Sequence, residues 1–217
     1  MQNNPFKFKF SDHIFYLLPE KALYWEREKI IILADLHLGK ASHFRKQGLP
    51  ITAEVIKKDY LILKQLIIKY EPEKFLILGD LFHSEVNNEW DIFREFIKIN
   101  SNISFEFIFG NHDILSADKY NSIGLINRGT LLEIDDLIFT HQPLDIVPEN
   151  CLNIAGHIHP GVKLQGIARQ QVILPCFYRN KGNFIVPAFG NLTGLHILKQ
   201  TKSTQIFGIN GSKILQV

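Results

Sequence analysis

Five apolar runs in this chain stop at a residue that can bind a metal ion. The runs are IIILAD, FLILGD, FIFGN, LIFTH and LNIAGH, and they end at Asp35, Asp80, Asn111, His141 and His157. Short apolar runs of this kind are typical of buried strands. Because ligands bind beyond the carboxyl ends of parallel strands, we expect the five side chains to converge on one crevice.

Further ligand-type residues accompany these stops. Residues two apart in an extended segment point the same way, so His37 can join Asp35, and His159 can join His157. Glycines, which let the backbone turn sharply, stand beside three of the stops, at positions 79, 110 and 156. Any one of these histidines alone would more often be a packing residue. Five stops in order along one chain favour a metal centre.

The residue types also indicate which ions the centre would bind. A mixture of imidazole, carboxylate and amide ligands suits Mn, Fe, Zn, Co or Ni, whereas a shell of oxygen atoms alone would suggest Mg or Ca. The chain has only two cysteines, Cys151 and Cys176, so a thiolate zinc site and a disulfide framework are both excluded.

The composition is that of an ordinary globular protein, with 217 residues of which 46% are hydrophobic and 21% charged. No linker interrupts the sequence, so we expect one domain over residues 1–217. A net charge of +2 neither requires nor excludes a polyanionic partner. The amino terminus lacks a signal-type apolar region, and no apolar run approaches the ~20 residues needed to cross a bilayer. We therefore expect a soluble, cytoplasmic protein that does not bind membranes.

The elements that must position these residues alternate in the first half of the chain. Apolar periodicity predicts a hairpin at Ile14–Leu18 and Ala22–Trp25, strands at Ile30–Ala34, Phe75–Leu78 and Phe105–Phe109, and helices at Thr52–Tyr70 and around Trp90–Ile97. After about residue 122, short apolar runs between Gly, Pro and Asn predict strands through to Val217. The pattern favours an α/β fold of two packed sheets with helices outside.

The blocks D-x-H, G-D, G-N-H-D, H and G-H-x-H follow in this order from Asp35 to His159. Their combination resembles the calcineurin-like metallophosphoesterase superfamily, which implies a four-layer αββα sandwich of two mixed sheets flanked by helices. Four further stretches are similar to the bacterial ligase-associated DNA-damage-response endonuclease subgroup: DLHLGK at 35–40, Phe44-Arg45 with Gly48 and Pro50, GDLFHS at 79–84, and PAFGNLTG at 187–194.

The resemblance implies a role for each residue of these blocks. The first ion would be held by Asp35, His37 and His159. The second ion would be held by Asn111, His141 and His157, and Asp80 would bridge the two ions. His112 would face the phosphoryl group or the leaving oxygen without binding metal, and Asp113 would orient His112.

Residues beside the ligands suggest which side chains protonate and bind the substrate. An imidazole next to a carboxylate favours its protonated form, so His112 beside Asp113 suits a general acid. Arg45 can bind a phosphate bidentately and Phe44 can support a base, although a solvated loop explains their short basic stretch equally well. His83 either lies near Asp80 just outside the set of metal ligands or is a packing residue.

Two ions held roughly 3.5–4 Å apart, as the resemblance implies, activate a water molecule and stabilise the oxygens of a phosphoryl group during hydrolysis. The ligand-type residues and the resemblance together therefore predict metal-dependent hydrolysis of a phosphodiester. The resemblance implies that the substrate is DNA during repair, that Mn is the ion in use, and that a DNA ligase and a helicase are partners. Two alternatives stay open. One is the same chemistry on a small molecule, such as a cyclic nucleotide or a phosphomonoester. The other is a non-catalytic scaffold on the same fold.

Overall fold

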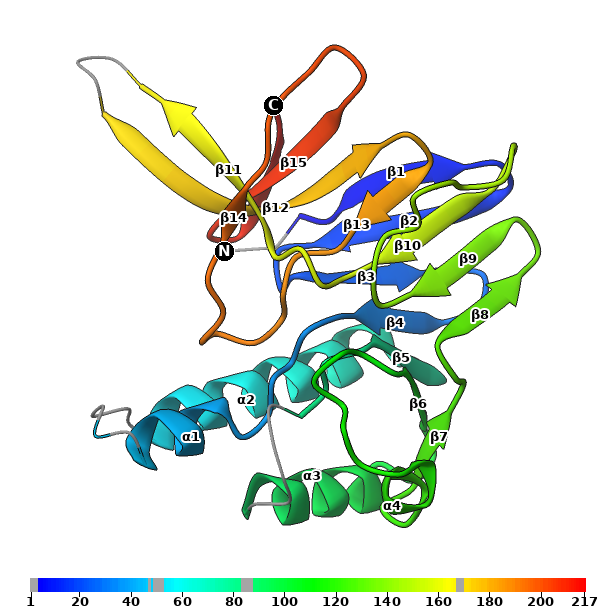
Figure 1. Cartoon of the computed structure of the whole chain (residues 1–217), viewed down its shortest axis with the longest axis vertical. Coiled ribbons are helices and arrows are strands. Elements are labelled where there is room, and N and C mark those ends of the chain that lie inside the picture. The colour runs from blue at the N-terminus through cyan, green and yellow to red at the C-terminus, as the bar shows by residue number, and fades with distance from the viewer. Residues whose placement is uncertain (1–3, 47, 49–52, 83–87, 167–169) are drawn as a thin grey trace.

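The computed structural model describes residues 4–46, 48, 53–82, 88–166 and 170–217, and Figure 1 shows their arrangement. The first sheet has seven strands, which lie in the order of the sequence: β1 (Phe6–Phe10), β2 (His13–Leu18), β3 (Ala22–Trp25), β4 (Ile30–Leu33), β5 (Lys74–Leu78), β6 (Ser104–Ile108) and β7 (Leu125–Asn127). Strands β1 to β4 are antiparallel, and β4 to β7 are parallel. The parallel strands therefore all end at the same edge of this sheet.

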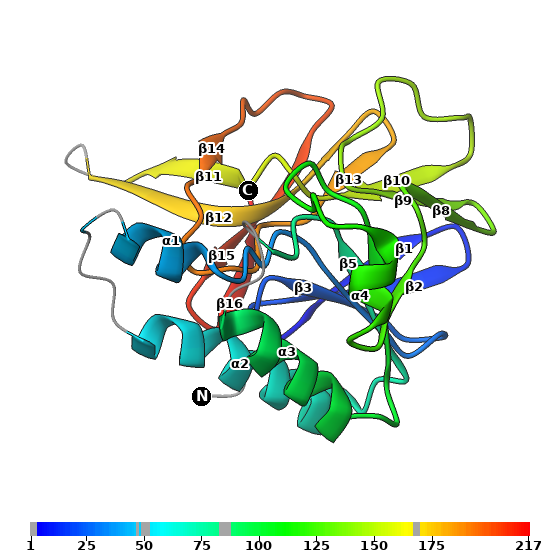
Figure 2. The same cartoon turned by 60° about the horizontal axis from the view of Figure 1, so that its bottom comes forward.

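Helices make the connections between the parallel strands, because a parallel pair needs a crossover. They are α1 (Lys40–Lys46) and α2 (Ala53–Tyr70) between β4 and β5, α3 (Asn88–Ile99) between β5 and β6, and α4 (Ala117–Asn121) before β7. Helices α2 and α3 pack on one face of the first sheet through buried side chains that include Leu66 and Phe93 (Figure 2). Among the described residues, no helix is long and apolar enough to cross a membrane.

The second sheet is formed by the carboxy-terminal half of the chain. Its strands are β8 (Leu131–Ile134), β9 (Leu137–Thr140), β10 (Leu152–Ala155), β11 (Pro160–Gln165), β12 (Gln171–Asn180), β13 (Asn183–Ile185), β14 (His196–Ile197), β15 (Gln205–Asn210) and β16 (Lys213–Gln216). The order across the sheet is β14-β11-β12-β13-β10-β9-β8, and β15 pairs with both β12 and β16. Strands β9, β10 and β13 are parallel neighbours.

The two sheets pack face to face through a large aromatic core. Phe15 and Trp25 of the first sheet are fully buried together with Phe139, Phe177 and Phe184 of the second. Burying a side chain of this size contributes roughly 1.5–3 kcal/mol. This core holds the ends of the two sets of parallel strands against each other.

The predicted fold class is confirmed, with two mixed sheets and flanking helices. The predicted strands and both predicted helices form, and the structure adds β1, α1 and α4. The described helices all precede residue 122, so none of them connects strands of the second sheet, and the described connections there are loops. In one such loop, the backbone N–H of Leu144 donates to the side-chain oxygens of Asn153 and Asn183, and its carbonyl accepts from the Asn183 amide. Both asparagines lie on the outer face of that sheet.

Candidate metal centre

The five residues at which the apolar runs stop lie just after the ends of parallel strands. Asp35, Asp80 and Asn111 follow β4, β5 and β6, which are neighbours in the first sheet. His141 and His157 follow β9 and β10, which are neighbours in the second. Because the sheets pack face to face, both sets of strand ends meet at one place, and the predicted convergence occurs.

One group of ligand-type atoms comes from Asp35, His37 and His159. Their ligand atoms lie within 4.8 Å of one another. The Nε2 atoms of His37 and His159 are 3.4 Å apart, and the His159 Nε2 atom is 3.5 Å from Oδ1 of Asp35. The backbone N–H of His157 donates to the other oxygen of Asp35, which fixes the orientation of this carboxylate.

A second group comes from Asp80, His141 and His157, again with ligand atoms within 4.8 Å of one another. The His141 Nε2 atom is 3.1 Å from Nδ1 of His157 and 2.9 Å from Oδ1 of Asn111, so Asn111 joins this group. The Nδ1–H of His141 donates to the carbonyl of Leu78. This bond leaves Nε2 as the ligand atom, as is usual for histidines that bind metal.

Asp80 lies between the two groups. Its Oδ1 atom is 3.4 Å from Nε2 of His141, and its Oδ2 atom is 3.9 Å from Nε2 of His37. The carboxylate therefore offers one oxygen to each group. The backbone N–H of His112 also donates to Oδ1, which holds the carboxylate in this orientation.

These residues fit two divalent ions. Within the part of the chain that the structure describes, Oδ1 of Asp35 is buried without a hydrogen-bond donor, although a buried carboxylate oxygen requires a proton donor or a cation. Neutral imidazoles and carboxylates arranged around two points suit first-row transition ions. The geometry does not distinguish Mn from the other ions of that series.

The backbone at the centre adopts conformations that ordinary strand or helix residues avoid. Five of the ligand residues have positive φ, with values from 49° to 67°: Asp35, His37, Asp80, His157 and His159. Such conformations cost of order 1–3 kcal/mol each, and they cluster at functional sites. A Cβ atom at Gly110 would collide with the backbone nitrogen and the carboxylate of Asp80, so only glycine fits there.

The local electrostatics keep His37, His157 and Asp80 in the forms that bind metal. Burial lowers the pKa of His37 to about 3, so its imidazole is neutral near neutral pH. Burial and the neighbouring His141 lower the pKa of His157 as well. Burial alone would raise the pKa of Asp80, but its hydrogen bond and charge interaction with His141 lower it to about 2. The same partnership raises the pKa of His141 despite the burial of that ring.

His112 is half-buried beside the centre, with its ring 5.5 Å from the ring of His37. That Asp113 orients this imidazole stays a prediction. The Asp113 carboxylate accepts hydrogen bonds from the backbone N–H groups of Gly110, Leu81 and Phe82, at 2.9, 3.1 and 3.3 Å. Because its oxygens are directed to the backbone, Asp113 positions the loop that carries His112. Burial raises the pKa of Asp113 to about 6.

The basic stretch after the first block forms helix α1. Arg45 lies on this helix with an exposed side chain, and Phe44 is partly buried.

Sequence reasoning gave no separate role to Lys40, the first residue of α1. Burial lowers the pKa of Lys40, while the charges of Asp35 and Asp80 raise it, so this amine lies close enough to the centre to sense both ligand carboxylates. His83 and Pro50 lie outside the described residues.

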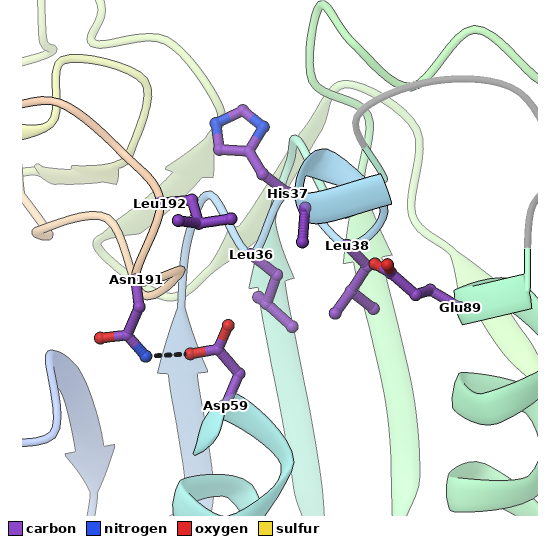
Figure 3. A pocket seen from close by; sticks show the side chains of 8 residues that line it. Leu36, His37, Leu38, Asp59, Glu89, Asn191 and Leu192 are labelled. Atoms are coloured by element: carbon purple, nitrogen blue, oxygen red, sulfur yellow. Dashed lines mark hydrogen bonds between the residues drawn. The ribbon is translucent and has the colours of Figure 1, made fainter. Parts of the chain in front are cut away.

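A small pocket lies behind the first ligand group, lined by the backbone and side chains around Leu36 and His37 (Figure 3). Asp59 of α2 accepts a hydrogen bond from the Asn191 amide, and the His37 ring points away from this pair. On the other side, the buried carboxylate of Glu89 accepts from the backbone N–H of Gly39. Helix α3 thus binds the loop that follows His37 directly, whereas α2 binds Asn191, whose neighbour Gly190 donates its backbone N–H to the carbonyl of Asp35.

Comparison with known proteins agrees with this geometry. Residues 28–175 match the family model of the calcineurin-like phosphoesterases. The crystal structure of the nuclease MPE of Pseudomonas putida superposes with a TM-score of 0.83 at 22% sequence identity, over 99% of this chain and 100% of that one. At this identity the likeness shows a shared fold. No curated protein matches the sequence.

Proposed function

The chain belongs to the calcineurin-like phosphoesterase family and is a metal-dependent phosphoesterase, and we propose that it is a cytoplasmic nuclease that hydrolyses phosphodiester bonds of DNA during repair. Its two ions would be Mn²⁺. A DNA ligase and a helicase are the proposed partners, on the strength of the four subgroup-like stretches described above.

The observation that carries the proposal is the position of Asp80 between the two ligand groups. One oxygen faces His141 and the other faces His37, so a single carboxylate can hold two cations close together and offset their repulsion. When bound, such a pair of ions activates water and neutralises charge on the phosphate oxygens. This is the chemistry that hydrolysis of a phosphodiester needs.

The surrounding side chains supply the remaining functions. His112 lies beside both ligand groups without belonging to either, and its imidazole would donate a proton to the leaving oxygen. Lys40 brings a positive charge to the same edge, and Arg45 follows on the same helix. A substrate phosphate would therefore meet two metal sites, a proton donor and cationic side chains.

The choice of DNA over a small molecule rests on two further observations. The stretches DLHLGK and PAFGNLTG, which are similar to the endonuclease subgroup, pack together at the centre: the backbone N–H groups of Phe189 and Gly190 donate to the carbonyls of Ala34 and Asp35. In addition, a protein whose solved structure is titled a nuclease shares the fold over its whole length.

Cleavage of circular DNA tests the proposal, since a circle has no ends and its opening reports an endonuclease. Metal-stripped protein would receive Mn²⁺, Fe²⁺, Zn²⁺, Co²⁺ or Ni²⁺ and be offered single-stranded and duplex circles, a cyclic nucleotide and a phosphomonoester. We expect cleavage of DNA that is highest with Mn²⁺, that weakens steeply as salt rises, and that is absent in Asp80→Asn. Turnover of the small molecules without cleavage of any DNA would refute the nuclease assignment.

A further inference from the structure

A second cationic site lies away from the metal ligands, where the turn between β12 and β13 meets the loop before β15. The hollow is lined by Arg179, Lys181 and Lys202, together with Gly182 and residues 203–205. Three of the lining side chains are cations and none is a carboxylate. Within the described part of the chain, no ion pair involves any of these three cations, so the hollow carries an uncompensated positive charge.

Arg179 is held in place by its neighbours. Its guanidinium lies 5.4 Å from the ring centre of Phe8 and 5.9 Å from that of Phe10, and it donates to the amide oxygen of Gln205 at 3.2 Å. Its side chain is partly buried, and this burial lowers its pKa. A desolvated cation is costly unless an anion compensates it. The fixed guanidinium therefore favours a bound anion.

The two lysines are displayed by ordered turns. Lys181 has a φ of 49°, and it is followed by Gly182 with a φ of 79°, which together form a tight turn. In the neighbouring loop, the Thr204 hydroxyl makes two hydrogen bonds of 2.9 Å with the backbone of Thr201. It accepts one from the N–H of Thr201 and donates the other to the carbonyl of Thr201. The backbone that carries Lys202 is thereby fixed, so little ordering is needed when a ligand binds.

We propose that this hollow binds a phosphate group. An arginine presents a planar fork that matches phosphate oxygens, and lysines add point charges with rotatable donors. We call Arg179, Lys181 and Lys202 the distal cation site.

The distal cation site is at the opposite end of the second sheet from the metal ligands. Asn183, at the start of β13, pairs with Asn153 at the beginning of β10, whereas His157 follows the end of β10. At roughly 3.3 Å per residue, Lys181 and His157 are on the order of 20 Å apart along the strands. One phosphate cannot occupy both places, but one nucleic-acid strand can reach both. The inference in this form rests on the proposed function.

The test uses two pairs of substitutions that remove equal charge. Lys181→Asn with Lys202→Gln removes the lysines of the distal cation site, and asparagine tolerates the positive φ at position 181. Lys64→Gln with Lys98→Gln removes two exposed lysines from helices α2 and α3 as the matched control. Both proteins would be titrated, metal-free, with inorganic phosphate and with a single-stranded oligonucleotide long enough to span the two sites.

We expect the distal-site variant to bind the oligonucleotide about five- to tenfold more weakly than the control, as the removal of two weak ionic interactions implies. Its plot of log affinity against log salt should be shallower by about 0.7 for each phosphate that the two lysines neutralise in the wild type. Weaker binding of phosphate with unchanged binding of oligonucleotide would support the site and identify free phosphate as its ligand. Equal behaviour of variant and control in both titrations would overturn the proposal.

Hydrolysis of bis(p-nitrophenyl) phosphate separates this inference from the proposed function. This diester is too small to span both sites, so the distal-site variant should hydrolyse it at the wild-type rate when reconstituted with Mn²⁺. Failure of the wild type itself on this diester and on DNA would refute the nuclease assignment while the anion titrations still report on the site.

Arg179→Gln should weaken phosphate binding further. Because Arg179 contacts Phe8 and Phe10, thermal unfolding would check that this variant is folded.

Discussion

His112 stands beside the metal ligands without belonging to either ligand group. Its backbone N–H is bound to Asp80, and its ring lies 5.5 Å from that of His37. We predict that His112→Ala lowers the rate of diester hydrolysis by about 10²–10⁴-fold with metal content unchanged, because only proton transfer is removed. Metal analysis of the purified variant checks this. A fall in bound metal would instead make His112 a ligand.

At this scale, the sequence indicates which residue types meet, because five of the predicted ligands end apolar runs and the other two, His37 and His159, follow two residues later. Asn111, His141 and His157 are examples, and the structure brings all three together. Their assignment to particular ions stays a prediction. The partners of Asp113 were not predictable from its neighbour His112, since its carboxylate binds the backbone of Leu81 and Phe82, which are distant in sequence.

At the scale of elements, the strand ends need glycine for close packing. A Cβ atom at Gly79 would lie 2.6 Å from Cγ of His141, and the φ of Gly79 is 74°. Gly129, with a φ of 79° and nothing within 4 Å of a Cβ atom, is a matched control. We predict that Gly129→Ala costs about 1–2 kcal/mol of stability. Gly79→Ala should cost roughly 1–3 kcal/mol more through the collision.

Urea unfolding of the two glycine variants measures this difference, and metal titration should show weaker binding for Gly79→Ala alone. Equal losses of stability in both variants would mean that the His141 ring moves aside without cost. The predicted extra cost of the collision at Gly79 would then be wrong.

Some elements were predictable from sequence and others were not. The long helix α2 shows a helical repeat of apolar residues, and the buried strands β4 and β5 show continuous apolar runs. Strand β1, with the sequence FKFKF, carries the alternation of a half-buried strand, and this signal was missed. Helix α1 has only seven residues and no acidic residue in its first turn, so its sequence gives little helical signal.

At the scale of the whole molecule, the packing of α2 against the segment after β13 makes stability depend on pH. Burial raises the pKa of Asp59 to about 6, although nearby Lys21 and Asn191 lower it. The unfolded carboxyl has a pKa of about 3.9, so the folded chain loses stability as pH rises through this interval. Asp59→Asn keeps an acceptor for Asn191 and removes the ionisation.

Unfolding free energies of the wild type and of Asp59→Asn between pH 4 and pH 7 provide the comparison. We predict that the wild type loses roughly 2–3 kcal/mol relative to the variant as pH rises from about 4 to above 6. Parallel stability curves for the two proteins would show that the Asp59 carboxyl does not bind its proton more tightly in the folded state.

We infer that Asp80 joins two metal sites into one catalytic centre. The most direct measurement counts the Mn²⁺ ions bound by metal-stripped wild type and Asp80→Asn after reconstitution, and follows hydrolysis of bis(p-nitrophenyl) phosphate by the same samples. We predict two ions per wild-type chain with metal-dependent hydrolysis, and fewer than two ions without hydrolysis in the variant. Two ions and undiminished hydrolysis in Asp80→Asn would contradict it.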